Sequence, residues 1–158
     1  MPTAQRSLFN TIAAESVHVH LALWSSIMSV GSDLGEIFIN HDARMHMDGE
    51  HAIPQLIAAH KRSKYLTNLL LIISGVSGAL TYQQTKDNYW LIGSGLMLAG
   101  IPYCALLEYP VTEQLKFLTL DAKSDKAKTL LTSWGSIQLG KLVLALGGAT
   151  IFYWFARR

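Results

Sequence analysis

Three long apolar runs limit what this chain can fold into. They read "YLTNLLLIISGVSGALTY" (65–82), "NYWLIGSGLMLAGIPYCALL" (88–107) and "IQLGKLVLALGGATIFYWFA" (137–156). Each is close to the length of about 20 residues that crosses a bilayer as one helix. A soluble bundle would alternate apolar and polar faces along its helices, and the first two of these runs do not. The runs therefore predict membrane-spanning helices.

A fourth and less apolar stretch, near residues 17–39, completes a four-helix pattern. Half of the 158 residues are hydrophobic and only 15% are charged, which is unusual for a soluble chain. The sequence predicts an all-α fold, a four-transmembrane-helix bundle that forms one integral membrane domain over residues 1–158. The expected spans lie near 17–39, 65–83, 89–109 and 130–155.

The connections between the spans determine the expected topology. Four spans place both termini on one side of the membrane, and the short connection 83–87 makes the second and third spans an antiparallel hairpin. We expect the 40–64 connection to be polar, with a short interfacial helix after Pro54. We expect segment 110–131 to extend the third helix and to begin the fourth. The excess of Lys and Arg in these two long connections favours a cytoplasmic location for them.

The first span carries ionisable groups, and they gather on one side of the helix. At about 100° per residue, a stripe of polar and small residues contains Glu15, His18, Ala22, Ser25, Ser29, Ser32, Asp33, Glu36 and Asn40. Bulky apolar residues such as Trp24 and Phe38 lie on the other side. Ionisable groups near the bilayer centre are costly, so the stripe must face the bundle interior or a water-filled cavity. Gly31 and Gly35 point away from it and suit contact with another helix or a second copy of the chain, so a homo-oligomer is one alternative.

The fourth span has a matching stripe. Its members are Trp134, Gln138, Lys141, Ala145, Gly148 and Phe152. An intramembrane lysine marks a functional site by default, and we expect Lys141 either to meet Glu108 or Glu36 across the bundle or to wait for an anionic ligand. The alternative is that Lys141 extends to the headgroups and that the serines of the first stripe serve helix packing. The second span adds Asn68 to the polar set.

Three histidines of the first connection have the composition of a metal site but not its spacing. His41, His46 and His51 are five residues apart, with Met45 and Met47 between them, and such ligands suit copper. A spacing of five does not place side chains on one face of a helix, and no HxxxH or CxxC motif occurs. We expect no metal and no cofactor. A formal charge of +2 gives no reason to expect nucleic acid, so the expected partners are the bilayer and a hydrophobic small molecule.

Two stretches resemble a family of small four-helix membrane proteins, grouped as a domain of unknown function, that includes the fungal anthrone oxygenases. In "IPYCALLEYPVTEQL" (101–115) the similar positions are Pro102, Tyr103, Pro110, Thr112 and Leu115. In "LLTSWGSIQLGKL" (130–142) they are Trp134, Gln138 and Lys141. The segment "IAAHKRSKYL" (57–66) is similar to the basic element before the family's second helix. Three of these positions depart from the family, which more often has Asn, His or Asn, and Arg where this chain has Thr112, Gln138 and Lys141.

The resemblance implies a monooxygenase that oxidises a fused aromatic polyketide, an anthrone, to a quinone with dioxygen. Such a reaction needs a base for the methylene proton and a cation or hydrogen-bond donor for the enolate. Glu36 or His18 is then the base, and Lys141 with Gln138 holds the oxyanion. His18 and Glu36 are about 27 Å apart at about 1.5 Å per residue, so only one can act. Glu36 is favoured because burial makes a carboxylate a better proton acceptor.

Further side chains complete the site that the resemblance implies. Glu108 is an additional catalytic group, and Trp134 and Phe152 flank a flat ring. The other substrate-binding residues are Gln138, Asn68, Ser29, Asp33 and Tyr103.

Two alternatives to this oxygenase stay open. A cofactor-free isomerase or cyclase would use the same pocket for acid–base chemistry on a hydrophobic intermediate. A non-catalytic small membrane carrier or assembly protein would use the polar stripes to hold its helices together. A cavity that opens toward the lipid favours an enzyme, and a closed bundle with its acids paired favours a structural protein.

Overall fold

The computed structural model describes residues 3–117 and 121–157, and the side chains of 17–117 and 121–157. The elements in chain order are α1 (Thr3–Gly35), η1 (Glu36–His41), α2 (Asp42–Met45), α3 (Gly49–Thr85), α4 (Asn88–Tyr103), η2 (Cys104–Glu108), α5 (Tyr109–Phe117) and α6 (Asp125–Ala156). The two η elements are π-helical segments that continue the helices before them. Every element within the described ranges is helical and none is a strand, so the predicted all-α bundle is confirmed.

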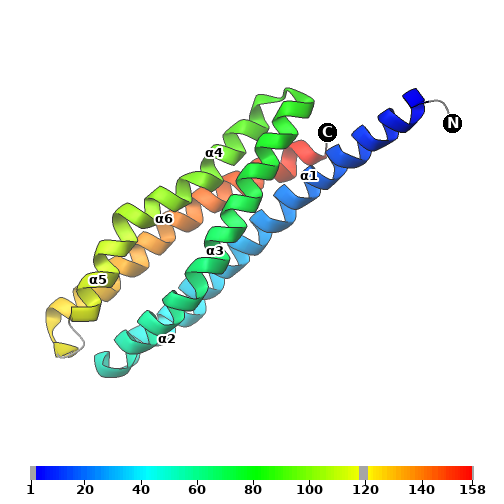
Figure 1. Ribbon diagram of the computed structural model, residues 1–158. Coiled ribbons are helices and arrows are strands. Elements are labelled where there is room, and N and C mark those ends of the chain that lie inside the picture. Colours follow the sequence, from blue (N-terminus) through cyan, green and yellow to red (C-terminus); the bar gives the residue numbers. More distant parts are fainter. Residues whose placement is uncertain (1–2, 118–120, 158) are drawn as a thin grey trace.

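The four long helices form an antiparallel bundle (Figure 1). α1 packs against α3 and α6, and α4 packs against the same two helices, so each long helix has two neighbours around a shared interior. α1 begins and α6 ends at one end of the bundle, where the turn between α3 and α4 also lies. α2 and α5 lie at the opposite end, which places residues 40–60 and 84–87 at different ends.

The hairpin between α3 and α4 forms through a short turn. Lys86 adopts a left-handed backbone conformation with φ of 59°, and its N–H donates to the carbonyl of Tyr82 at 2.8 Å. Asp87 then caps α4, because its carboxylate accepts a hydrogen bond from the N–H of Tyr89 at 3.1 Å. These caps end one helix and begin the next within three residues of chain, as the short connection predicts.

The first connection is more helical than the sequence predicts. α3 begins at Gly49 and continues through Pro54 to Thr85, so the residues after Pro54 are helical as expected, but the expected short helix that starts at this proline is wrong, because the segment belongs to one long helix. The cause is burial, because Ala52, Ile53 and Leu56 are fully buried in a cluster with Leu115 and Trp134. An apolar face that packs on the bundle keeps this segment in one continuous helix, and packing of this kind provides most helical stability in proteins.

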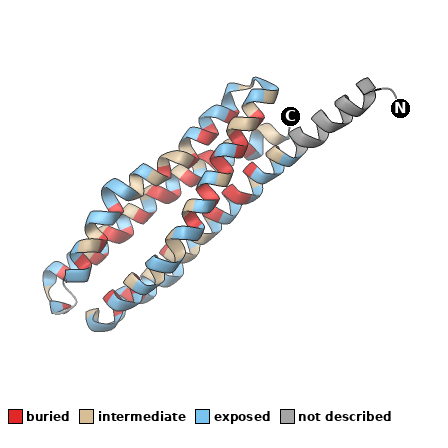
Figure 2. Cartoon of the chain, in the orientation of Figure 1, coloured by how far each residue is buried: buried red, intermediate tan, exposed pale blue. Residues whose placement is uncertain are grey.

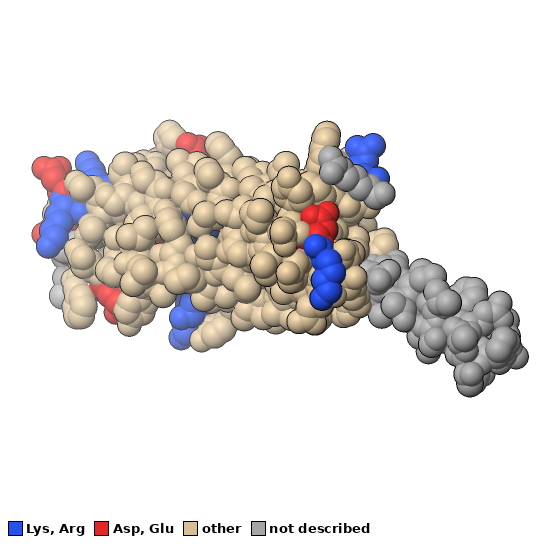
Figure 3. All heavy atoms as spheres, turned by 90° about the horizontal axis from the view of Figure 1, so that it is seen from above, with Lys and Arg blue, Asp and Glu red and all other residues tan. Residues whose placement is uncertain are grey.

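The outer surface is apolar along the middle of the molecule. α3, the continuous helix Asn88–Phe117 and α6 are long and apolar enough to cross a membrane. On the face shown in Figure 3, charged atoms gather toward the two ends of the bundle and a broad band without them lies between. Large exposed hydrophobic residues include Leu106 and Val143. These features are those of a membrane protein.

The described part of α1 is not apolar enough to be counted with these three helices, because many of its side chains are polar. They are turned inward. Ser29 and Asp33 are buried, whereas Trp24 of α1 and Phe38 of the following η1 are both 64% exposed on the opposite side. The buried face of α1 therefore follows the predicted stripe, and Figure 2 shows the buried residues of the long helices on their inner sides. The side chain of Glu15 lies outside the described residues, and the fourth span stays a prediction.

Two apolar clusters form the core, and they lie at different levels of α6. One contains Leu131 and Trp134 near the start of α6, and the other contains Ala145 and Phe152 further along it. Between these levels, α6 carries Gln138 and Lys141, both buried. The bundle thus has a polar layer between two apolar ones.

Candidate functional site

A cavity of about 230 Å³ occupies the polar layer. All four long helices, together with η1 and η2, contribute to its wall. The polar residues that line it are Ser32, Asp33, Glu36, His60, Ser63, Lys64, Thr67, Asn68, Cys104, Glu108, Tyr109, Trp134, Gln138 and Lys141. The predicted site residues Asp33, Glu36, Asn68, Glu108, Trp134, Gln138 and Lys141 are among them, so these come together around one space.

Some of the residues that line the cavity are also exposed on the outside of the bundle. Among the lining residues, Ala105 and Tyr109 are exposed, and Lys64 on α3 is partly exposed. The cavity therefore lies close to the outer surface beside η2 and the start of α5.

Asp33 and Lys141 form an ion pair inside the bundle. The Nζ of Lys141 is 2.7 Å from Oδ1 of Asp33, and the Asp33 side chain is only 2% exposed. The other carboxylate oxygen, Oδ2, is buried and has no hydrogen-bond partner in the described part of the chain. The sequence named Glu108 or Glu36 as the partner of Lys141, and this was wrong. Helix periodicity predicts which face of a helix a residue lies on, but not which residue of a neighbouring helix lies at the same height along the bundle axis.

Glu108 lies on the other wall and accepts two hydrogen bonds at one oxygen. Its Oε1 accepts from Nε2 of Gln138 at 2.6 Å, and Nδ1 of His60 lies 3.0 Å from the same oxygen. η2 brings this carboxylate inward, and Glu108 is 4% exposed. Pro102 and Pro110 flank η2, and neither has an N–H for the regular helix ladder. π-helical segments of this kind are frequent at functional sites.

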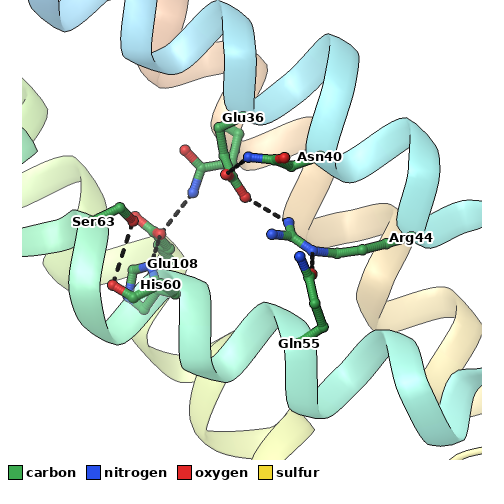
Figure 4. A network of polar contacts seen from close by, with 8 residues as sticks. Glu36, Asn40, Arg44, Gln55, His60, Ser63 and Glu108 are labelled. Carbon is green, nitrogen blue, oxygen red and sulfur yellow. Dashed lines mark hydrogen bonds and ion pairs between the residues drawn. The ribbon is translucent and has the colours of Figure 1, made fainter.

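Glu36 is held by a network at the end of the cavity nearest α2 (Figure 4). Its Oε1 lies 2.5 Å from Nη1 of Arg44, and its Oε2 accepts from Nδ2 of Asn40 at 2.8 Å. Arg44 also donates to Gln55, is fully buried, and lies over the ring of Trp134 at 5.6 Å from the ring centre. Both carboxylate oxygens of Glu36 are therefore occupied, which does not fit the free base that the sequence predicts.

Four predicted site residues lie away from the cavity wall. Phe152 stacks on Trp90 with 5.2 Å between ring centres, and so belongs to the second apolar cluster. The hydroxyl of Tyr103 lies against the backbone of Gly140. His18 and Ser29 are on the inner side of α1 but nearer its start, and neither lines the cavity. The sequence placed them on the correct face, but the cavity covers only a short part of that face.

His60 and Arg44 are site residues that the sequence did not identify. His60 reads as part of the basic run "HKRSK" before a membrane span, and Arg44 reads as a loop residue. Once α3 begins at Gly49, helical steps of three and four connect Ile53, Leu56, His60 and Thr67 on one face. The sequence spacing therefore places His60 on the buried face, but only if the helix is known to begin before Ile53.

The three histidines of the first connection do not form a cluster. His41 lies in η1 with its ring 5.6 Å from that of Trp134, the Nδ1 of His46 is 2.9 Å from the carbonyl of Asp42, and His51 is exposed on α3. Within the described residues, no three His, Cys, Asp or Glu side chains are arranged to hold a metal ion. The absence of a metal and of a cofactor stays a prediction.

His41 lies beyond the predicted span, beside Trp134 of the cavity wall. Burial is the main reason that the pKa of its imidazole is lowered, and the neighbouring Arg44 guanidinium adds to the effect. Its Nδ1 is buried without a hydrogen-bond partner among the described residues. His41 is therefore held as a neutral ring that packs on Trp134 and on Gly135.

No family model, no curated protein and no solved structure matches the chain. The resemblance to the anthrone oxygenase family accordingly stays an expectation. The chemistry available at the cavity is that of a buried carboxylate beside an ammonium group, with a histidine–carboxylate pair on the opposite wall. Such a set can take a proton from a ligand and stabilise the negative charge that results.

Proposed function

We propose that this protein is a membrane-embedded acid–base enzyme that takes a proton from a lipophilic aromatic ketone of the anthrone type. The observation that carries the proposal is Asp33. Its carboxylate lies in the cavity wall, one oxygen is held by Lys141, and the other has no partner in the described residues. Buried polar groups are nearly always hydrogen-bonded, so a buried carboxylate oxygen without a donor needs an explanation. Availability for a substrate proton is such an explanation.

The first step is proton removal. Oδ2 of Asp33 accepts one methylene proton, and the electron pair of the C–H bond moves into the ring ketone to give an enolate. Asp33 becomes neutral in this step, which releases Lys141 to interact with the enolate oxygen. The total charge in the cavity does not change, so the step avoids the cost of creating a new charge in an apolar surrounding.

The second step uses dioxygen as the oxidant. The enolate carbon is oxidised by dioxygen, a C–O bond forms, and Asp33 returns its proton to the resulting peroxide. Loss of the second methylene hydrogen as a proton, with cleavage of the O–O bond, gives the new carbonyl and hydroxide, which together with that proton makes water. The balance is one ketone and one dioxygen to one quinone and one water.

The size and position of the cavity restrict how such a ligand would bind. A volume of about 230 Å³ is below the roughly 300–1,000 Å³ of common ligand pockets. An anthrone that exceeds this volume would leave part of its fused ring system outside the cavity, next to the exposed lining residues Ala105 and Tyr109.

One observation favours a non-catalytic alternative. Each acid in the cavity wall has a partner, because Glu36 meets Arg44, Glu108 meets His60 and Asp33 meets Lys141. Paired acids of this kind also hold helices together in an assembly or carrier protein.

A third candidate, a cofactor-free isomerase or cyclase, would share the proton removal by Asp33 and omit dioxygen.

Hydrogen exchange and oxidation of anthrone separate the three functions. The purified protein in detergent is given anthrone in deuterated buffer under argon, and methylene exchange is measured by mass spectrometry; quinone formation in air is measured by absorbance. An oxygenase accelerates both reactions over buffer, an isomerase accelerates exchange alone, and an assembly protein accelerates neither.

Variants assign the proton removal to Asp33. Asp33→Asn should abolish exchange and oxidation together, and Asp42→Asn, an exposed acid that follows η1, should change neither. Because Asp33→Asn leaves Lys141 without its partner, the double variant with Lys141→Met serves as a second inactive form without the orphaned charge. Full exchange activity in either Asp33 variant would contradict the proposal.

A further inference from the structure

His60 is a cavity residue that the first proton transfer does not use. It lies on α3, and its side chain is 20% exposed, so it connects the buried wall with the outside of the bundle. Its Nδ1 is 3.0 Å from Oε1 of Glu108. Figure 4 shows the two side chains pointing toward one another from different helices.

The contacts of Glu108 determine which nitrogen of His60 carries the hydrogen. A carboxylate accepts hydrogen bonds and does not donate them. In the neutral ring, Nδ1 therefore carries the hydrogen, and Nε2 keeps its lone pair as a base. Gln138 donates to the same oxygen of Glu108 at 2.6 Å, which holds the carboxylate in place.

Trp134 restricts the ring further. Its indole lies 6.5 Å from the His60 ring at an interplanar angle of 88°. Contacts with the carboxylate and with the perpendicular indole limit rotation of the imidazole. A carboxylate that orients a histidine in this way also stabilises the imidazolium that forms when Nε2 takes a proton.

We propose that His60 is the second catalytic base of the cavity, which removes the second methylene hydrogen, while Asp33 removes the first. This inference rests on the proposed function. The oxidation takes two protons from one carbon in separate steps, and the cavity presents two bases from different helices, Asp33 on α1 and His60 on α3.

The second step balances with His60 in this role. After Asp33 has returned its proton to the peroxide, Nε2 of His60 removes the remaining C–H proton. The electron pair of that bond forms the second bond of the carbonyl, and the O–O bond breaks with release of hydroxide. The imidazolium, stabilised by Glu108, gives its proton to the hydroxide to make water, and both bases return to their starting states.

The test is a comparison of exchange and oxidation in His60 variants. His60→Ala and His60→Gln should keep anthrone exchange under argon near the wild-type rate and should lower the rate of quinone formation in air by about 100-fold or more, the usual size of general-base effects. His51→Ala, an exposed histidine on the same helix, should change neither rate. Wild-type exchange tests the proposed function by itself and is independent of the His60 result.

Added imidazole distinguishes a base from a packing residue. Free imidazole in the buffer should restore oxidation in His60→Ala, where the removed ring leaves space near the surface, and not in His60→Gln, where the side chain fills it. A merely structural role would not respond to imidazole. The inference is overturned if His60→Ala oxidises anthrone at the wild-type rate, or if it loses exchange and oxidation together in proportion to its unfolded fraction.

Discussion

Lys141 and Asp33 form an ion pair across the interior of the bundle, with Nζ 2.7 Å from Oδ1 and both side chains buried. The pair connects α6 to α1 in the layer between the two apolar clusters. It leaves Lys141 with a partner before any ligand arrives, and it leaves one oxygen of Asp33 without a partner among the described residues. The same contact thus has a structural role and, in the proposed mechanism, positions the base.

Replacing Lys141 by methionine should destabilise the protein. The change leaves the Asp33 carboxylate buried without its partner, and removal of one member of a buried pair typically costs about 3–5 kcal/mol. The free energy of unfolding in detergent, measured with a denaturant series, should fall by this amount. Lys128→Met, which removes an exposed lysine from the same helix, should have little effect.

The double variant Asp33→Leu with Lys141→Met should recover most of the loss, because neither member of this pair then leaves an unpartnered charge in the interior. A Lys141→Met protein with unchanged stability would show instead that the lysine is not needed to neutralise Asp33.

Replacing Glu36 by glutamine should affect stability more than catalysis. The glutamine keeps an oxygen for Arg44 but loses the charge, and hydrogen bonds to charged groups contribute about 1.5–3 kcal/mol. We therefore expect a comparable loss in the free energy of unfolding, with the rate of anthrone exchange within a few-fold of wild type. If the folded Glu36→Gln protein has no exchange activity, Glu36 is the base, as the sequence alone predicts, and Asp33 is not.

The sequence predicted which side chains point into the bundle better than it predicted their height along the bundle axis. The inner face of α1 and the buried stripe of α6 follow from a period of 3.6 residues, because burial in a bundle depends on helix face. The partner of Lys141 does not follow, because it depends on how far α1 is displaced along its axis relative to α6. His18 and Phe152 were placed in the site for the same reason, since they share its face but lie at another level.

The π-helical segments could not be predicted from periodicity. Glu36 and Glu108 lie in η1 and η2, where the helix widens and the 100° step no longer holds. The start of α3 was also not predicted, because the polar residues around Asp48 made the segment with Ala52, Ile53 and Leu56 look like a loop. Without this helix start, His60 could not be assigned to the inner face of α3.

Replacing Gly93 by alanine should destabilise the second apolar cluster. A Cβ at this position would lie 2.6 Å from Cε1 of Phe152, which is fully buried and stacked on Trp90. Overpacking of this kind costs about 1–3 kcal/mol. Gly95→Ala is the matched control on α4, since a Cβ there meets no atom of the described residues within 4 Å and alanine favours the helix. Thermal unfolding in detergent should show a lower Tm for Gly93→Ala only; equal Tm values would mean that Phe152 moves aside at no cost.

The lowered pKa of His41 predicts a loss of stability in mild acid. Its ordinary value is 6.5, and burial together with the Arg44 guanidinium lowers the folded-state value. Below about pH 6.5, the unfolded chain binds a proton at this imidazole that the folded chain does not bind, so the free energy of unfolding falls as the pH falls. The contribution of the neutral His41 ring to the free energy of unfolding is fully present above the pKa of this ring in the unfolded chain. It is lost as the pH decreases through the lower pKa of the ring in the folded chain.

The pH effect should depend on His41 and not on the exposed histidines. The difference in Tm between about pH 7.5 and about pH 5.5 should be smaller in His41→Gln than in wild type, because glutamine does not titrate. His51→Gln, at an exposed position, should retain the wild-type difference. Nδ1 of His41 is buried and has no hydrogen-bond partner among the described residues, so a proton carried there would have no acceptor, which adds to the cost of charging the ring. An unchanged difference in His41→Gln would show that other groups cause the acid sensitivity and that His41 is accessible to protons in the folded protein.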